Sequence, residues 1–376
     1  MHRKKRFLAG LLSLSMIFSM FPAGSGNIEA KAAEEEQVLL KLTFDDEENG
    51  FKSTNGKAVN SGTAVLSEDA VSGKALQLKG SSNYLTLTDT DGNSLLAGRD
   101  EITISYYSKV SNTSANWAVY AAPDAGTQTY QKEHYLGILE NGNKITAERY
   151  NNNGARPAVV SAASTAGQWK HVALVVEKGQ TSLYIDGVKT SQTSSYALSD
   201  ILGNAGTDVF YIGKANWGSG EYFNGLIDEF TVYDHAVSEE EIEKIALESA
   251  TDNTVDTLLA KYKEALTLDD ILENNAVFSD GKLSLPEKSG NADVTWGSDK
   301  PEVIAADGTV MIPTETTDVT LTATLALKGK TVTKQFTVQA VSRNSMADYW
   351  EANYTIPTVL TAKDKLDTTY ARSEER

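Results

Sequence analysis

The sequence predicts an all-β protein in which two β-sandwiches follow one another, joined by a short helical linker. Two apolar runs, Val172 to Val176 and Leu183 to Ile185, are rich in β-branched and aromatic residues and flank the polar turn Glu177 to Gln180. This pattern is typical of a β-hairpin. Similar short runs, separated by turn residues, recur on both sides of it. Strands at this spacing favour sandwiches over a parallel sheet, whose strands would alternate with helices.

The first 32 residues have the character of a secretory signal peptide. Arg3 to Arg6 are basic, Phe7 to Phe21 form an apolar run, and Ala30 to Ala32 offer a small-x-small cleavage site. A retained membrane anchor is the alternative, but serines interrupt the apolar run and Pro22 follows it. We therefore expect the segment to be removed and the protein to be secreted.

The charge and the cysteine content narrow the classes of partner and of site. Removing the first 32 residues takes away five basic residues and one acidic residue, so the formal net charge changes from −17 to −21. A surface of this sign repels phosphate, which argues against nucleic acid as a partner. The chain contains no cysteine, which excludes disulfides and thiolate metal sites. No later segment approaches the roughly 18 apolar residues of a membrane span, so we expect no membrane insertion.

The first predicted sandwich covers residues 38 to 248. Its strands are short runs of apolar or alternating residues, and the strongest turn signals between them are Asn141-Gly142 and Asp186-Gly187. Besides the hairpin described above, the expected strands are Val38 to Phe44, Ala75 to Leu87 (itself a hairpin), Ile102 to Tyr107, Asn116 to Tyr120, His134 to Leu139, Lys144 to Tyr150, Val209 to Gly213 and Leu226 to Tyr233.

Helical patterns then lead to the second sandwich. Ser238 to Glu241 form a capping box ahead of a short helix that is expected to dock on the edge of the first sandwich. The linker, residues 249 to 272, contains a second helical pattern from Val255 to Leu266.

The second sandwich is predicted over residues 273 to 342. Thr-rich alternations at 319 to 325 and 331 to 339 predict a hairpin with one solvent-facing side, turning around Lys328 to Lys330. Residues 343 to 376 have no clear period and stay unassigned.

Two sets of residues carry resemblances to known families. Trp169-x-His171-Val172-Ala173, Leu183 to Gly187 (LYIDG), Tyr211-Ile212-Gly213 and Phe223 to Phe230 (FNGLIDEF) occur in this order. Together they resemble the laminin-G-like or concanavalin A-like jelly-roll family over roughly residues 38 to 246. Thr295 to Ile304 (TWGSDKPEVI) with Asp307 to Val310 (DGTV) resembles bacterial immunoglobulin-like domains of secreted, multi-modular proteins. The pair resembles accessory regions of secreted bacterial glycoside hydrolases.

A calcium site is expected at the seam of the first domain. The first and last strands of a jelly roll are neighbours, so Asp45 and Asp46 are expected to approach Asn224 and Asp228. Clustered carboxylates repel one another unless a hard cation neutralises them, and Ca²⁺ accepts irregular oxygen coordination. The alternative is that Asp228 caps a neighbouring backbone amide while Asp45 and Asp46 lie in water.

An aromatic platform for sugar is the second candidate site. Sugar rings pack their C–H faces on Trp and Tyr, while nearby amides and charged groups bind the hydroxyls. Core packing is the alternative for each aromatic residue taken singly, and Trp169 is assigned to the core or rim. The candidate residues are Trp117, Tyr120, Tyr135, Arg149, Tyr150, Trp217, Glu221 and Tyr222.

Catalytic signals are weak. Glycoside hydrolysis needs two acids about 5 to 10 Å apart, and Glu221 with Glu229 is the only pair whose positions suggest it. Catalytic proteins of the broader concanavalin-like fold typically show a Glu-x-Asp-x-x-Glu strand motif, which this sequence lacks. His171 lies within an apolar strand and is expected to be structural, and neither His134 nor His235 has a second ligand at zinc spacing.

The sequence therefore predicts a secreted, non-catalytic region that binds polysaccharide or glycan outside the cell and holds an enzyme near it, with a catalytic domain expected downstream. Two alternatives remain open. In the first, the chain is a glycoside hydrolase of the arabinan or xylan type, or a fragment of such an enzyme. In the second, it is an adhesin or surface spacer whose first domain binds protein.

Overall fold

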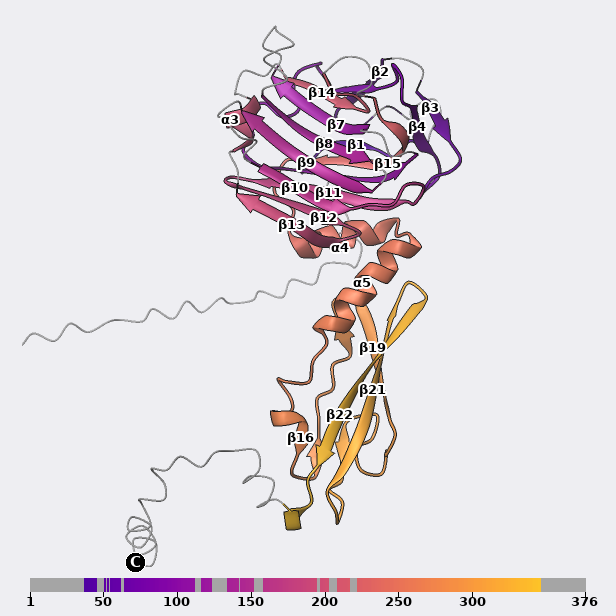
Figure 1. Ribbon diagram of the computed structural model, residues 1–376, viewed down its shortest axis with the longest axis vertical. Coiled ribbons are helices and arrows are strands. Elements are labelled where there is room, and N and C mark those ends of the chain that lie inside the picture. The colour runs from indigo at the N-terminus through magenta and orange to yellow at the C-terminus, as the bar shows by residue number, and fades with distance from the viewer. Residues whose placement is uncertain are drawn as a thin grey trace, which may run out of the picture.

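The computed structural model describes residues 37–45, 51, 53, 55–61, 64–111, 116–123, 134–141, 143–151, 158–194, 197–202, 208–216 and 222–345. They form two β-domains with helices between them (Figure 1). The all-β class and the order of the two sandwiches are as the sequence predicts. No helix in these segments is long and apolar enough to cross a membrane.

The first domain is a sandwich of an eight-stranded and a seven-stranded sheet. The eight-stranded sheet runs β13-β12-β11-β6-β15-β4-β3, with β1 also paired to β15, and the other runs β10-β9-β8-β7-β14-β5-β2. The strands of the first sheet are β1 (Val38–Leu42), β3 (Val65–Ser67), β4 (Ala75–Lys79), β6 (Ile102–Val110), β11 (Lys170–Glu177), β12 (Gln180–Ile185), β13 (Val188–Ser194) and β15 (Asn224–Tyr233). Those of the second are β2 (Lys57–Asn60), β5 (Leu85–Thr88), β7 (Asn116–Pro123), β8 (His134–Asn141), β9 (Lys144–Asn151), β10 (Ala158–Ala163) and β14 (Asp208–Ile212).

The predicted neighbourhood of the first and last strands is confirmed. Strand β1 pairs antiparallel with β15, and Leu42 lies opposite Phe230. The core between the two sheets consists of aliphatic and aromatic side chains from nearly every strand, because alternate residues of each strand point inward. Strands β2, β3 and β10 and the short helix α3 (Leu198–Leu202) were not among the predicted elements.

Two helices cover the outer face of the eight-stranded sheet. Helix α4 (Glu239–Glu248) begins at Ser238, whose side chain accepts a hydrogen bond from the amide of Glu241, as the capping box predicts. Its buried Ile242 packs with Ala173, Val175 and other outward-facing residues of that sheet. Helix α5 (Asp252–Ala265) follows and extends toward the second domain (Figure 1).

The second domain has a five-stranded sheet, β16-β22-β21-β19-β18, and a two-stranded sheet, β17-β20. Its dominant feature is the predicted hairpin, in which Leu327 pairs with Lys330 across Lys328 and Gly329. Both turn residues have positive φ, at 47° and 82°, as a tight primed turn requires. The elements are η1 (Glu273–Asn275), β16 (Ala276–Val277), β17 (Gly281–Lys282), β18 (Lys288–Ser289), β19 (Ala292–Ser298), β20 (Thr309–Val310), β21 (Thr317–Leu327), β22 (Lys330–Ala340) and η2 (Arg343–Ser345).

Helix α5 is a structural part of the second domain, in addition to linking the two. The buried Leu258, Leu259 and Tyr262 belong to one apolar cluster with Val294, Leu325 and other residues of the second sheet. Val188 of the first domain packs against the same cluster. The predicted linker is therefore a shared core element.

Polar contacts strengthen this junction. Asp186 lies in the turn before β13 and accepts hydrogen bonds from the amide of His171 at 3.0 Å and from the hydroxyl of Thr254 at 2.9 Å. The hydroxyl of Tyr262 donates to Glu243 of α4 at 2.5 Å. Buried hydrogen bonds thus hold the turn of the first domain and both helices together. Separating these elements would leave buried polar groups without partners, which costs free energy.

Candidate functional site

The outer face of the seven-stranded sheet carries an aromatic cluster that contains three of the predicted residues. The ring centroids of Trp117 and Tyr120 on β7 are 6.0 Å apart, and the ring of Tyr135 on β8 lies 5.9 Å from Trp117 and 5.5 Å from Tyr120. These three rings are therefore neighbours in the structure. Their rings are nevertheless buried, with exposed fractions of 6%, 0% and 1%, so they form the base of the face and do not offer open rings.

A bulge in β7 explains why Trp117 and Tyr120 share a face. Residues three apart on a regular strand point to opposite sides of the sheet, but the register of β7 against β8 shifts between Trp117 and Val119. Gly137 on β8 provides the space for the indole, since a Cβ there would lie 2.4 Å from an atom of the Trp117 ring.

Partly exposed rings form the edge of this face. Tyr84 precedes β5, Tyr211 lies on β14 opposite Tyr120, and Tyr222 bridges to Trp117 and Lys214. Tyr84 makes an edge contact with Tyr211 at 5.5 Å and lies 6.5 Å from Tyr222. The ammonium of Lys214 lies 4.4 Å from the centroid of Tyr84 and 4.6 Å from that of Tyr211. We call Tyr84, Tyr211, Lys214 and Tyr222 the tyrosine edge.

The tyrosine edge combines the two kinds of group that sugar recognition uses. Phenol rings provide apolar faces for C–H groups, and the phenolic hydroxyls and the ammonium are hydrogen-bonding partners for sugar hydroxyls. The cation also fixes the two rings that flank it by cation–π attraction. Of these four residues, only Tyr222 was a sequence candidate, because the others become neighbours through strand pairing between distant segments.

Arg149 does not belong to this face. Successive residues of β9 alternate sides, so Glu148, whose carboxylate accepts a hydrogen bond from the Tyr135 hydroxyl at 2.6 Å, is on the outer side while Arg149 points into the sandwich. Arg149 is fully buried, and none of its guanidinium nitrogens makes a hydrogen bond within the described part of the protein. Burial lowers its pKa to about 10. The predicted role of Arg149 beside the aromatic rings is therefore not supported by its position.

The remaining predicted sugar-binding residues lie outside the described part of the chain. Trp217 and Glu221 belong to residues 217–221, and the side chain of Tyr150 on β9 is likewise outside it. Their roles stay predictions.

The residues of the predicted calcium site are only partly brought together. Asp228 is buried and accepts hydrogen bonds from the amides of Val71 at 3.0 Å, Ser72 at 3.2 Å and Glu229 at 2.9 Å. Asp45 accepts one from the amide of Lys74 at 3.0 Å. Both carboxylates thus hold the loop before β4, and the amide-capping alternative for Asp228 is what the structure shows.

Asn224 begins β15 and pairs with Lys79, whereas Asp228 lies four residues further along the strand and pairs with Tyr107. Asp46 lies outside the described residues. Among the described residues no group of three His, Cys, Asp or Glu side chains is arranged to hold a metal ion. Burial raises the pKa of Asp228 to about 7, against the three amides that favour its charged form. Calcium binding by this set stays a prediction.

The titratable groups in the core are structural. His171 is fully buried, its Nε2 lies 2.8 Å from the Ser105 hydroxyl, and burial lowers its pKa to about 3. Glu140 lies in the core, where it accepts hydrogen bonds from the hydroxyls of Tyr106 at 2.9 Å and Ser108 at 2.8 Å. The sequence did not reveal Glu140, because an acid in a short strand looks like a solvent-facing residue.

A pair of acids for glycoside hydrolysis is not assembled by the described residues. Glu229 is partly buried with its carboxylate 4.0 Å from the ammonium of Lys41, and burial raises its pKa. Its suggested partner Glu221 lies outside the described segments.

Comparisons with known proteins agree with the two-domain architecture. Residues 79–243 match the family model of the concanavalin A-like lectin/glucanases superfamily, and residues 259–343 match that of the atrophied bacterial Ig domain. No curated protein matches the sequence significantly.

Several solved structures are distantly similar. Domain 4 of AbnA, an extracellular arabinanase from Geobacillus stearothermophilus in complex with arabinotriose, shares 20% identity, with 56% of this chain and 98% of that chain covered and a TM-score of 0.43. The carbohydrate-binding module of a Ruminococcus gnavus sialidase shares 20% identity, over 39% of this chain and 83% of that one, with a TM-score of 0.34. The binding domain of botulinum neurotoxin DC shares 11% identity, over 80% and 74% of the two chains, with a TM-score of 0.42. None of these similarities assigns a residue or a ligand to this chain. From the family matches and the fold, the chain consists of a laminin-G-like jelly-roll domain of the concanavalin A-like lectin/glucanases superfamily followed by a bacterial immunoglobulin-like domain.

Proposed function

We propose that this chain is a non-catalytic, carbohydrate-binding accessory region of an extracellular polysaccharide-degrading system. The observation that carries the proposal is the tyrosine edge, where three partly exposed rings and one ammonium lie side by side on a sheet of a lectin-superfamily domain. Secretion is part of the same proposal and is supported by the basic and apolar character of the first 32 residues. A downstream catalytic domain is its natural companion.

The junction between the domains fits this role. An accessory region is useful when the binding face keeps a defined position relative to whatever follows it. Helix α5 shares its apolar face with the second domain and its first turn with the first domain. This geometry favours a stiff spacer over a flexible tether.

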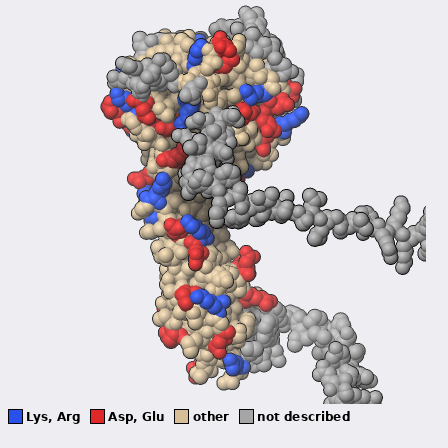
Figure 2. Space-filling model, turned by 180° about the vertical axis from the view of Figure 1, so that it is seen from behind, with Lys and Arg blue, Asp and Glu red and all other residues tan. Residues whose placement is uncertain are grey.

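The surface charge is compatible with a neutral ligand. Figure 2 shows acidic and basic side chains interspersed on the visible face, with no broad basic patch of the kind that attracts polyanions.

The test is binding of residues 33–376 to arabinan, xylan and cellulose oligosaccharides by isothermal titration calorimetry. Tyr84→Ala and Tyr222→Ala should each weaken binding about fivefold, since one aromatic contact contributes on the order of 1 kcal/mol. Tyr233→Ala is the matched control, because Tyr233 is a partly exposed tyrosine on the opposite sheet. Unchanged affinity in both edge variants would remove the tyrosine edge as the binding site.

Two further readouts separate the alternatives. Release of reducing sugar from any of these polymers by the purified chain would instead indicate a hydrolase. Cell adhesion without any glycan signal would indicate an adhesin.

A further inference from the structure

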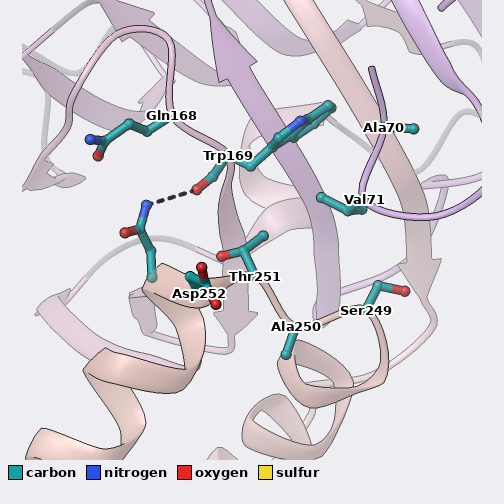
Figure 3. A pocket seen from close by; sticks show the side chains of 9 residues that line it. Ala70, Val71, Gln168, Trp169, Ser249, Ala250, Thr251 and Asp252 are labelled. Atoms are coloured by element: carbon teal, nitrogen blue, oxygen red, sulfur yellow. Dashed lines mark hydrogen bonds between the residues drawn. The ribbon is translucent and has the colours of Figure 1, made fainter. Parts of the chain in front are cut away.

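A groove runs along the junction of the first domain with helix α5, away from the tyrosine edge. It consists of two cavities, one of about 340 Å³ and one of about 270 Å³. Both are lined by Gln168, Trp169 and Asn253, so these residues separate the two halves. The Asn253 side-chain amide donates to the backbone carbonyl of Trp169 at 3.4 Å across this divide (Figure 3).

The indole of Trp169 forms one wall of the first half. Figure 3 shows the ring beside Val71 on the side of the first domain, with Ala250 and Thr251 at the start of α5 opposite. The indole is partly exposed, and its Nε1 donates to Asp69 at 2.9 Å. Asp69 is itself held by the ammonium of Lys109 at 2.6 Å, which lowers the pKa of that carboxyl. The ring is therefore fixed in place, and a fixed apolar face reduces the entropy lost when a ligand stacks on it.

The second half is lined by polar residues of the first domain and of α5. Gln168 is exposed, and Asn253 and Thr257 lie on α5 at the same cavity. Their amides and hydroxyl can bind the hydroxyl groups of a ligand. Lys170 also lines this half, but its ammonium is buried and lies 3.3 Å from a carboxylate oxygen of Glu140, so it is paired within the first domain.

The balance of charge points to a neutral ligand. The carboxylates of Asp252 and Asp256, in the first two turns of α5, lie 3.2 and 2.9 Å from the ammonium of Lys330. The carboxylate of Glu140 likewise faces Lys170. The two carboxylates of α5 face one ammonium, so the groove carries a small excess of negative charge, which disfavours an acidic sugar. Amides and hydroxyls are available for the hydroxyl groups of a neutral sugar.

We propose that this groove is a second carbohydrate subsite, in which a neutral sugar unit stacks on Trp169 and receives hydrogen bonds from the side-chain amides of Gln168 and Asn253. The subsite rests on the proposed carbohydrate role of the domain but not on the tyrosine edge. It would let one polysaccharide chain, or two, contact the protein at separate points, which raises the apparent affinity for a polymer above that for a short fragment.

The experiment titrates residues 33–376 with arabinotriose, xylotriose and cellotriose in a calorimeter and compares stoichiometry. The expected result is two binding sites in the unaltered protein for at least one of these probes. Trp169→Ala should abolish one site or weaken it about tenfold or more, while Tyr222→Ala should affect the other. Gln168→Ala, at an exposed position, should weaken the same site as Trp169→Ala and guards against a folding defect in the larger substitution.

Each outcome distinguishes the two proposals. Unchanged stoichiometry and affinity in both Trp169→Ala and Gln168→Ala would overturn the groove and leave the tyrosine edge standing. If Trp169→Ala loses all binding while Tyr222→Ala binds as the unaltered protein does, the groove is supported and the tyrosine edge is refuted. Preference for trigalacturonate over the neutral probes, lost in Trp169→Ala, would overturn the neutral class of ligand. Absence of binding by all of the probes overturns both.

Discussion

Leu258 is the residue through which the integrity of the domain junction is best tested. It is fully buried in α5, within the cluster that joins the helix to the second sheet. It also reaches the first domain, since its Cδ2 atom lies 3.2 Å from where a Cβ on Gly187 would be. Leu258→Ala removes this contact while leaving the helix intact, because Ala has the highest helix propensity.

The size of the effect follows from burial. Burying a whole Leu side chain contributes about 1.5 to 3 kcal/mol, and a cavity that the surroundings cannot fill raises the cost of Leu→Ala to about 3 to 4 kcal/mol. Strands on one side and the turn at Gly187 on the other restrict collapse around this position. We therefore expect the free energy of unfolding to fall by about 3 kcal/mol.

The assay is urea unfolding of residues 33–376, followed by circular dichroism, with hydrogen exchange measured on the native protein. Peptides from β12–β13 and from the β21–β22 hairpin should both exchange faster in Leu258→Ala, because both pack on α5. The control is Glu264→Ala, at an exposed position of the same helix, which should change stability by less than about 0.5 kcal/mol. A loss below about 1 kcal/mol, or faster exchange in only one of the two domains, would refute the shared core.

Three further predictions follow from other contacts. Gly187→Ala should destabilise the protein by about 1 to 2 kcal/mol in the same urea assay, because its φ of +79° is strained for Ala and α4 and α5 lie close to the added Cβ. His171→Gln should make the free energy of unfolding depend less on pH in the acid range. The pKa of His171 is about 3 in the native protein against 6.5 in the unfolded chain, so the unaltered protein loses stability as the pH falls below 6.5. At pH 5 this loss amounts to about 2 kcal/mol relative to the variant. The opposite contribution of Asp228, whose raised pKa favours the folded state at lower pH, is common to both proteins and cancels in that comparison. If the free energy of unfolding changes equally with pH in both proteins, the lowered pKa of His171 is contradicted. Lys334→Met should lower the melting temperature by a few degrees, since the Lys334 ammonium donates to the carbonyl of Leu266 at 2.8 Å just beyond the end of α5.

Local sequence patterns predicted the features that depend on neighbouring residues. The turn at Asp186-Gly187 has positive φ at both residues, as the Asp-Gly pair indicates. The hairpin around Lys328 follows from strict alternation and a Lys-Gly turn. The cap at Ser238 follows from a four-residue motif. Each of these depends on steric preferences within a few residues, which the sequence displays directly.

Predictions about the site were less complete because they depend on contacts between distant segments. The position of Trp117 over Gly137 needs a bulge in β7, and no sequence signal marks it. Arg149 was grouped with aromatic residues of its own segment, although strand alternation directs it to the opposite side. The tyrosine edge needs β5, β14 and the residues after β14 to meet in one sheet.

The sequence by itself determined that the chain forms two β-sandwiches in series, with a helix between them, since the periods of two and of 3.6 residues are local properties of the chain. Only the tertiary structure decided that this helix belongs to the core of both domains, that Trp117, Tyr120 and Tyr135 lie buried next to the tyrosine edge, and that Trp169 faces a groove between the first domain and α5. The physical reason is that burial and hydrogen-bond pairing depend on what packs against a residue from elsewhere in the chain, and hydrophobic patterning shows which side of an element is buried without showing against what.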